Sequence, residues 1–386
     1  MIKKIVLIIT GSIAAPKGIE LYNDLKKHYQ VELVLSRGAQ KFIQTMPKDA
    51  HIEMFKQDFY DKSHASLHIE IALNADLLIV YPASHNFIAK ISHGLSDDLS
   101  TLVFSATNSH KMIFPAMNTH MFNNPANLNN IKLLSSFGIE VLMPQTGLLA
   151  CNAIGLGRAW EWIDVTNHIN QFFQLKNQLK NKNVLINFGR TRTYLDPIRY
   201  LTNNSSGKMG IALYNALKLT SANLTAISGD IDMDINFPVI KVTTNQQMWL
   251  AMKQHFNHQD IVISVASLND FKVENVVNHK LNKQQNAFLN IKLSPNIDVL
   301  EQLGRIKTKQ ILIGFSAQDD ENDEVMAKQK LKRKYLDAIV VNNIKVMNQD
   351  HTSSTWISPT KTLKLTVGTK LFVAQQIVKQ ISELVK

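Results

Sequence analysis

The chain contains a single cysteine, Cys151, among its 386 residues. One thiol excludes a disulfide within the chain, and few cysteines are typical of reducing compartments, so we expect a cytoplasmic protein. No apolar run approaches the roughly 18 residues that a membrane helix needs. Residues 1–10 are largely apolar with two lysines, but Gly11 interrupts them and no small-residue cleavage site follows. They predict a first strand and no signal peptide.

Charged residues are also few, at 19%, whereas apolar residues make up 45%. This apolar fraction can fill two cores, and the length exceeds that at which single cores stop growing, so we expect two domains. The net charge of +11 would suit nucleic acid or phosphorylated small substrates, or simply reflect a lysine-rich genome. The basic residues are spread out, with residues 328–334 as the only dense cluster, and no nucleic-acid-binding motif accompanies them. Nucleic acid is therefore the least favoured partner.

Short apolar runs alternate with helical patterns along the whole chain. We predict strands at Lys4–Ile9, 31–35, 75–81, 111–114, 184–186, 224–227, 261–265, 311–314, 338–341 and 363–367, and helices at 17–27, 85–93, 160–175 and 371–385. This alternation predicts an α/β protein whose parallel sheets are covered by helices. The polar segment 176–183, rich in Asn and Lys, is the predicted linker, and it gives domains at residues 1–178 and 179–386.

Residues 203–210, Asn-Asn-Ser-Ser-Gly-Lys-Met-Gly, lie where an apolar strand gives way to a helix. Gly207 and Gly210 would let the backbone approach a ligand, and N–H groups at a helix start favour an anion. The segment is not a P-loop, because the glycine spacing before Lys208 differs and Met209 stands where Ser or Thr would bind magnesium. An ordinary strand–loop–helix turn is the alternative. We predict an anion-binding loop.

Three loops of the first half also follow predicted strands. Residues 11–13, Gly-Ser-Ile, open a helix at the position where parallel sheets bind phosphate, although small residues there would equally allow close helix–strand packing. Residues 81–86, Tyr-Pro-Ala-Ser-His-Asn, end a second strand, and residues 114–118, Phe-Pro-Ala-Met-Asn, end a third. Together they indicate one ligand site at a sheet edge.

These loops resemble those of the flavin-containing cysteine decarboxylases. Residues 196–210 resemble the ligase half of the bifunctional phosphopantothenoylcysteine decarboxylase/phosphopantothenate–cysteine ligases of coenzyme A biosynthesis. The resemblance implies two Rossmann-like domains: an N-terminal flavodoxin-like flavoprotein decarboxylase domain and a C-terminal parallel-sheet ligase domain. It further implies that CTP drives ligation of cysteine to 4′-phosphopantothenate through an acyl-cytidylate. FMN would then serve decarboxylation of the product to 4′-phosphopantetheine.

The resemblance assigns residues of the first half to FMN: Gly11, Ser12, Ile13, Ser84 and Asn86. His68 matches the active-site histidine, Asn118 the asparagine that recognises the substrate carboxylate, and Cys151 the thiol that delivers a proton from a glycine-containing flap. On residue type alone, a lone histidine is more often a surface group and a lone cysteine a small buried hydrophobe. The flap departs from the family at two positions, Asn152 and Ala159. The histidines predicted to be structural are His64, His85 and His93.

In the second half, the resemblance assigns Arg199, Asn203 and Lys280 to catalysis, with Asn203 holding the acyl-cytidylate. The positions matched to CTP binding are Ser205, Gly207, Lys208, Asp270, Lys280, Lys283, Ile297, Asp298, Val299, Leu300, Phe315, Lys330 and Lys334. A Mg²⁺ site is implied, with Asp270 as a possible ligand. Lys330 and Lys334 lie one helical turn apart, a spacing that by itself indicates a solvated helix face.

The second half departs from the family in three places. The family begins this domain with Thr-Ala-Gly-Gly-Thr-Arg-Glu, whereas residues 187–193 are Asn-Phe-Gly-Arg-Thr-Arg-Thr, so Asn187, Phe188 and Thr193 differ and the acid is lost. Asn269 precedes Asp270 where alanine is usual. Gln318 and Asp319 stand where the family has Glu-Thr.

Other functions share parts of these patterns. They are a flavoprotein decarboxylase of another substrate with a decayed ligase domain, a flavin-dependent prenyltransferase, and a regulatory protein that binds flavin and nucleotide without turnover. The joint presence of Cys151, Asn118, Asn203 and Lys280 favours the bifunctional enzyme. Its expected partners are small-molecule substrates and other copies of itself, as decarboxylase trimers joined through ligase dimers, with no membrane and no nucleic acid.

Overall fold

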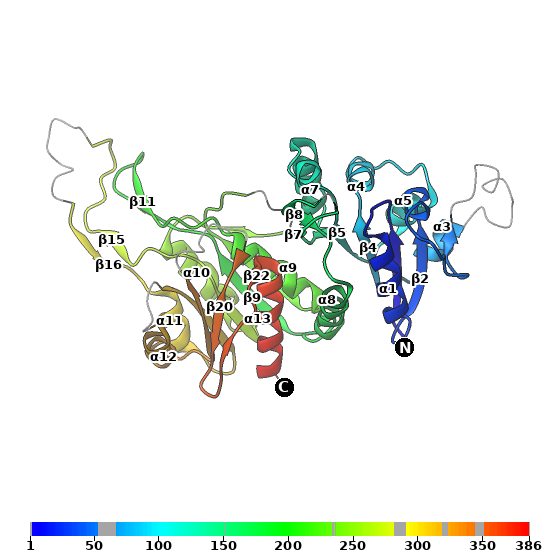
Figure 1. Ribbon diagram of the computed structural model, residues 1–386. Coiled ribbons are helices and arrows are strands. Elements are labelled where there is room, and N and C mark those ends of the chain that lie inside the picture. The colour runs from blue at the N-terminus through cyan, green and yellow to red at the C-terminus, as the bar shows by residue number, and fades with distance from the viewer. Residues whose placement is uncertain are drawn as a thin grey trace. The chain divides into compact units, whose positions relative to one another are not determined.

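The computed structural model describes residues 2–52, 67–150, 152–233, 235, 237–281, 291–318, 323–343 and 351–385. The chain forms two compact units, Met1–Asn170 and Gln171–Lys386 (Figure 1). Four residues discussed above lie outside the described ones: His64, Cys151, Lys283 and Asp319. Within the described ranges, no helix has the length and apolar character needed to cross a membrane.

The first unit is built on a six-stranded parallel sheet, with strand order β3-β2-β1-β4-β5-β6. Its strands are β1 (Lys4–Ile9), β2 (Gln30–Leu35), β3 (His51–Ile52), β4 (Leu77–Ala83), β5 (His110–Pro115) and β6 (Glu140–Val141). Without the two-residue β3, this is the 2-1-3-4-5 order of flavodoxin-like sheets. Ile5 to Ile9 are all fully buried, so both faces of β1 are covered, as expected of a central parallel strand.

The helices of the first unit are α1 (Ala15–Leu25), α2 (Arg37–Gln40), α3 (Leu67–Ala72), α4 (His85–Ser92), α5 (Leu99–Ala106), α6 (Thr119–Phe122), α7 (Pro125–Ser136) and the start of α8 (Trp162–Leu175). Ser84 caps α4 by accepting from the Phe87 N–H, and Asp98 caps α5. Strands β7 (Gln145–Leu148) and β8 (Ile154–Arg158) form an antiparallel hairpin, and the connection between them contains Cys151.

The second unit contains an eight-stranded sheet with the order β13-β12-β9-β14-β17-β18-β20-β21. The strands are β9 (Asn183–Phe188), β12 (Asn223–Ser228), β13 (Ile240–Lys241), β14 (Ile261–Ser264), β17 (Ile311–Gln318), β18 (Ala338–Asn343), β20 (Ser354–Ile357) and β21 (Thr362–Lys364). The parallel sheet that we predicted runs from β13 to β18, but β20 and β21 extend it antiparallel. We did not predict β20, because a single short run does not reveal a strand's direction or partner.

Helices cover both faces of this sheet: α9 (Lys208–Leu219) and α13 (Lys370–Leu384) on one face, and α10 (Asn245–Phe256), α11 (Val299–Ile306) and α12 (Asp323–Arg333) on the other. Side chains of successive residues along β9 point to opposite faces of the sheet and pack into the two cores alternately. Ile186 and Phe188 pack with α9 and α13, whereas Leu185 packs with α10 and α11. Figure 1 shows α13 beside α9.

Two hairpins project from the second unit (Figure 1). They are β10 (Arg192–Tyr194) with β11 (Tyr200–Thr202), and β15 (Phe271–Val273) with β16 (Leu293–Pro295); a third small pair joins β19 (His351–Thr352) to β22 (Gly368–Thr369). These pairs are antiparallel and lie outside the main sheet.

The structure divides the chain after Asn170, inside α8, whereas we placed the domain boundary at residues 178/179. The physical reason is burial. Leu175 and Leu179 are both fully buried in the core of the second unit. The predicted linker also bonds to that unit, since the Asn223 N–H donates to Lys182 O at 2.9 Å. Residues 176–183 therefore belong to the second unit.

Candidate functional site

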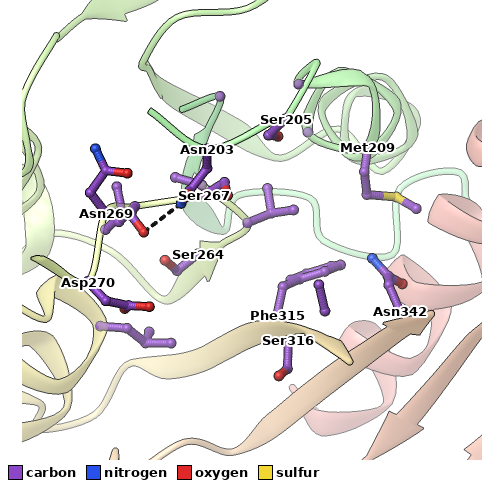
Figure 2. Close-up of a pocket in the computed structure, with 18 of the residues that line it drawn as sticks. Asn203, Ser205, Met209, Ser264, Ser267, Asn269, Asp270, Phe315, Ser316 and Asn342 are labelled. Carbon is purple, nitrogen blue, oxygen red and sulfur yellow. Dashed lines mark hydrogen bonds between the residues drawn. The ribbon is translucent and has the colours of Figure 1, made fainter. Parts of the chain in front are cut away.

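The second unit contains a cavity of about 470 Å³ at the carboxyl edge of its sheet. Its walls come from the loops after β9 and β14, from residues within the strands β17 and β18, and from the start of α9 (Figure 2). The chain leaves β9 toward α9 on one face of the sheet, whereas it leaves the neighbouring strand β14 toward α11 on the other face. Ligands of open α/β sheets bind outside the carboxyl ends of strands at such a switch point. The cavity is therefore the primary candidate site of this unit.

The predicted anion loop, residues 203–210, borders this cavity. Gly207 precedes α9 with φ of 79°, and a Cβ there would lie 2.4 Å from Cγ2 of Ile231, so only glycine fits. Gly210 has a different reason from the one we predicted. A Cβ on Gly210 would lie 2.1 Å from Cβ of Phe188, so this glycine lets α9 pack closely on β9. Lys208 and Met209, the first residues of the 12-residue α9, line the cavity, so the positive end of the helix adjoins it.

Hydrogen bonds hold the anion loop in place. Asn203 Nδ2 donates to Leu268 O at 2.9 Å, the bond drawn as a dashed line in Figure 2. The Ser205 N–H donates to Asn203 O at 2.9 Å, and Arg190 Nη1 donates to Ser205 O at 2.6 Å. The predicted residues Asn203 and Ser205 thus lie at the cavity with a defined orientation.

Charged side chains of both signs line the same cavity: Lys208, Lys330, Lys334 and Lys370, with Asp270 and Asp298. Lys330 Nζ donates to Ser316 Oγ at 2.9 Å, and Lys334 pairs with Asp298 at 2.6 Å. Asp298 also caps α11, since its Oδ1 accepts from the Glu301 N–H. These lysines are therefore held by cavity residues. They do not form the purely solvated helix face that their spacing alone indicates.

The remaining predicted nucleotide positions divide into three groups. Phe315, Ile297 and Leu300 line the cavity, whereas Val299 is fully buried in the core beneath it. Lys280, which was predicted for both CTP binding and catalysis, is not among the lining residues, and neither is Arg199, which was predicted for catalysis alone.

Arg199 and the segment that contains Lys280 and Leu281 are instead joined to each other through the buried Asp196. Arg199 Nη1 donates to Asp196 Oδ2 at 2.9 Å and to Leu281 O at 3.2 Å. The Leu281 N–H donates to the same carboxylate at 3.1 Å. The described part of the chain therefore places both predicted catalytic cations beside the projecting hairpins.

Several cavity residues escaped our sequence analysis: Asn245, Ser316, Asn342, Thr352 and Lys370. Asn342 lies near the end of β18, and Asn245 and Lys370 are the first residues of α10 and α13. Their position at a strand end or a helix start was the only sign in the sequence that they could line a site. The strand order is needed to tell which strand ends and helix starts meet at the same cavity.

No group of three or more His, Cys, Asp or Glu side chains that could hold a metal ion occurs within the described ranges. Asp270 lies at the cavity wall and is exposed. One carboxylate suits Mg²⁺ only where substrate phosphates supply further oxygens, which is how proteins usually bind this ion.

The first unit has a cavity of about 290 Å³ at the carboxyl ends of β1, β2 and β4. It is lined by Thr10, Gly11, Ser36, Arg37, Gly38, Ser84, Asn86, Phe87, Lys90, Asp97 and Asp98. Thr10 Oγ1 donates to Pro82 O and accepts from the Ser84 N–H, both at 2.7 Å, which ties the first and fourth strand ends together. A Cβ on Gly11 would lie 2.8 Å from Cα of Gly38, so these loops meet closely.

Gly11, Ser84 and Asn86 thus lie at this cavity as predicted positions for FMN, while Ser12 and Ile13 follow directly and are not lining residues. Ser12 Oγ donates to Ala116 O at 3.5 Å, and the Ile13 side chain is exposed. We missed Ser36 and Arg37. Both residues directly follow β2. This position points to the cavity only once β2 is known to lie beside β1 in the sheet.

The β7–β8 hairpin lies against the Met117–Asn118 segment. The Met117 N–H donates to Gly157 O at 3.1 Å, and a Cβ on Gly157 would lie 2.1 Å from Met117 O. Asn118 caps α6, its Oδ1 accepting from the His120 N–H at 2.8 Å. Asn118 and the hairpin that contains Cys151 are therefore neighbours, while His68 is half-buried on α3.

A buried acid, Glu140, links strands β5 and β6 of the first unit to α8. Glu140 accepts from His110 Nε2 at 2.8 Å and from His168 Nε2 at 2.9 Å. Burial alone would raise the pKa of Glu140, but the charge of His168 and the hydrogen bonds from both histidines hold that pKa well below its usual range. The network joins β5 and β6 to the start of α8.

Comparisons with known proteins cover the whole chain. Residues 1–174 match the family model described as Flavoprotein, and residues 179–385 match that described as DNA/pantothenate metabolism flavoprotein C-terminal domain. The coenzyme A biosynthesis bifunctional protein CoaBC of Haemophilus influenzae is 35% identical over 391 residues, covering 99% of this chain and 97% of the relative. The protein of the same name from Borreliella burgdorferi is 34% identical, covering 98% of each chain.

Among solved structures, the C-terminal domain of a coenzyme A biosynthesis bifunctional protein CoaBC is 32% identical, with a TM-score of 0.47, covering 54% of this chain and 98% of that chain. The sequence matches extend through both units, and they confirm the resemblance that the loop motifs indicated. The chain therefore belongs to the family of bifunctional coenzyme A biosynthesis proteins, which combine a decarboxylase and a ligase in one polypeptide.

Proposed function

We propose that the second unit uses CTP to activate the carboxylate of 4′-phosphopantothenate and that its cavity holds the acyl-cytidylate until cysteine attacks it. A carboxylate oxygen leaves readily only as part of an acyl-nucleotide, so the site must bind phosphates and a developing negative charge. The observation that supports this role is the meeting of an anion loop, a helix start and three lysines, Lys208, Lys330 and Lys334, at one cavity.

In this proposal, each cavity group has one task. Asn203 donates its amide to the phosphate of the acyl-cytidylate, with its orientation set by the bond to Leu268 O. Lys208 and the N–H groups that begin α9 bind phosphate oxygens. Lys330 and Lys334 neutralise the triphosphate. Asp270 would help to hold a Mg²⁺ ion, which would offset the negative charge of the phosphates.

Arg199 and Lys280 keep their predicted catalytic roles in this proposal, from a position beside the hairpins β10–β11 and β15–β16. These hairpins expose large apolar side chains: Ile198, Tyr200, Leu201, Phe271 and Leu293. Exposed apolar groups gathered on projecting hairpins support a homo-oligomer in which ligase units pair through this region. The expected decarboxylase trimer would be formed by the first units.

For the first unit, we propose that the cavity beside Gly11, Ser36 and Ser84 holds the FMN phosphate. When bound there, FMN would supply the redox chemistry that lets the substrate lose CO₂. Asn118 would bind the substrate carboxylate through its amide hydrogens, since its Oδ1 accepts from the His120 N–H. His68 would act before or during carboxylate loss, and Cys151 would deliver a proton after it.

The ligase proposal is tested by following pyrophosphate and the acyl-cytidylate by mass after incubation with 4′-phosphopantothenate, Mg²⁺ and CTP. The parent chain should release pyrophosphate without cysteine and consume the intermediate once cysteine is added. Asn203→Ala should lower kcat for ligation about 100-fold, as expected for losing one donor to a developing charge. No pyrophosphate from the parent, with either CTP or ATP, would overturn the assignment.

The decarboxylase proposal is tested with Cys151→Ser. If the thiol acts as the terminal proton donor, CO₂ release should stay within a fewfold of the parent while 4′-phosphopantetheine no longer forms. The measurement compares ¹⁴CO₂ release with product mass from the same sample. His68→Asn should abolish both signals. Equal loss of CO₂ and product in Cys151→Ser would show that the thiol acts earlier.

A further inference from the structure

Asn269 joins two loops that line the ligase cavity, and Asn203 forms the reciprocal bond. Asn269 Nδ2, in the loop after β14, donates to Leu201 O on β11 at 3.0 Å. Asn203 Nδ2 donates in the opposite direction, to Leu268 O at 2.9 Å. Figure 2 shows the two asparagines on the same side of the cavity. Each loop therefore supplies an amide that fixes the backbone of the other.

The Asn269 amide has one orientation that its surroundings allow. Besides Leu201 O, its Nδ2 lies 3.1 Å from both Thr191 O and Thr193 Oγ1. The Thr193 hydroxyl donates to Phe271 O at 3.1 Å, so it acts as an acceptor toward Asn269. Turning the amide over would set its oxygen against two carbonyls. Asn269 is only 8% exposed, so water cannot readily replace these bonds.

The backbone of Asn269 is held as firmly as its side chain. Asn245 Nδ2 donates to Asn269 O at 2.8 Å, and the Asn269 N–H donates to Thr191 Oγ1 at 3.3 Å. Thr191 Oγ1 in turn donates to Asn245 Oδ1 at 2.6 Å. Because Asn245 begins α10 and also reaches Ile297 O, this buried network extends to the loop before α11.

We propose that Asn269 is a positioning residue of the ligation reaction. Its amide ties the loop after β14 to Thr191 and Leu201 and so fixes the adjacent Leu268 carbonyl, which Asn203 binds. In this way Asn269 aims the Asn203 amide at the acyl-cytidylate. The two departures noted in the sequence, Thr193 and Asn269, are thus one hydrogen-bonded unit. The inference rests on the catalytic role proposed for Asn203, but it assigns Asn269 a function of its own.

A double-mutant cycle in the full-length protein tests this role. We would measure kcat for phosphopantothenoylcysteine formation and the Kd of CTP for the parent, Asn269→Ala, Asn203→Ala and the double variant. Asn269→Ala should lower kcat at least tenfold and change the Kd less than threefold. In the Asn203→Ala background it should lower kcat less than twofold further, because a residue that acts through Asn203 has nothing left to position.

Equal fold losses in both backgrounds would overturn the inference, because Asn269 would then act independently of Asn203. No loss in Asn203→Ala itself would refute the proposed role of Asn203, which is a different outcome. Asn257→Ala, at an exposed asparagine of the same unit, is the control and should stay within twofold of the parent. If Asn269→Ala gives no soluble protein, Thr193→Val takes its place under the same criteria, since it removes one acceptor of the Asn269 amide and keeps the side-chain shape.

Discussion

Glu140 is a buried carboxylate between two histidines, on a strand of only two residues. Its pKa is lowered relative to an exposed glutamate, so the folded state favours the ionised form. The carboxylate therefore adds to stability above the pKa of the unfolded chain. This contribution is lost as the pH falls toward the folded pKa.

We predict that Glu140→Gln lowers the free energy of unfolding of the first unit by about 3 kcal/mol at pH 7, in the range measured for breaking buried ion pairs. The difference from the parent should persist above about pH 5 and shrink below about pH 4, because only the parent loses a charge there. Urea titrations at pH 7, 5 and 4 measure it. Glu20→Gln makes the same charge change on the surface and should stay within about 0.5 kcal/mol of the parent. A difference that does not vary with pH would contradict the linkage.

For single residues, the sequence predicts a role only where that role depends on residues nearby in the chain. Gly207, which we expected to let the backbone approach a ligand, directly precedes α9 and borders the cavity. Thr193 and Asn269 were visible only as separate departures, since 76 positions separate them along the chain. Their hydrogen bond depends on how β10 meets the loop after β14. No local pattern contains that information.

Among the elements, the β7–β8 hairpin depends on a glycine contact. Gly157 has φ of 141° and no room for a Cβ beside Met117 O. We predict that Gly157→Ala displaces β8 from the Met117–Asn118 segment and lowers decarboxylation at least tenfold, while ligation stays within twofold. Both activities are measured on one preparation, with phosphopantothenoylcysteine or with 4′-phosphopantothenate, CTP and cysteine. Loss of both activities, or of neither, would contradict this role of the hairpin.

The sequence correctly predicted the strands that are buried on both faces of their sheet. Lys4–Ile9 is the strand that we predicted, and residues 261–265 and 311–314 overlap β14 and β17, because central parallel strands are continuous apolar runs. The hairpin β7–β8 escaped prediction. Its strands, Gln145–Leu148 and Ile154–Arg158, are mostly half-buried or exposed and contain three glycines, so no apolar run marks them.

Across the whole molecule, the two units share the same strand order in the main part of their sheets. In each sheet the first six main strands follow the order 3-2-1-4-5-6, and each candidate cavity lies at the carboxyl edge of its sheet, beside the end of the first strand. Each unit has its own hydrophobic clusters. The architecture was predictable from the alternation of strands and helices. The projecting hairpins were not, because they bury little surface of their own.

Because the cores are separate, we predict two unfolding transitions in calorimetry that respond to different ligands. CTP with Mg²⁺ at 100 times its Kd should stabilise the second unit by about 2.7 kcal/mol and leave the first unchanged, while FMN should do the reverse. Glu140→Gln identifies the first unit's transition, since it should lower that one alone. A single transition that both ligands raise would show that the units unfold together.

The division after Asn170 also affects how the chain emerges during synthesis. Every strand of the first sheet, from Lys4 to Val141, precedes that point, so no later segment is needed to complete it. The 216 residues that follow take about 10–40 s to make at typical elongation rates. Folding of a parallel sheet with distant pairings such as β1 with β4 is slow, but it fits within that interval. The flavoprotein unit can therefore reach its native state on the ribosome while the ligase unit is still being translated.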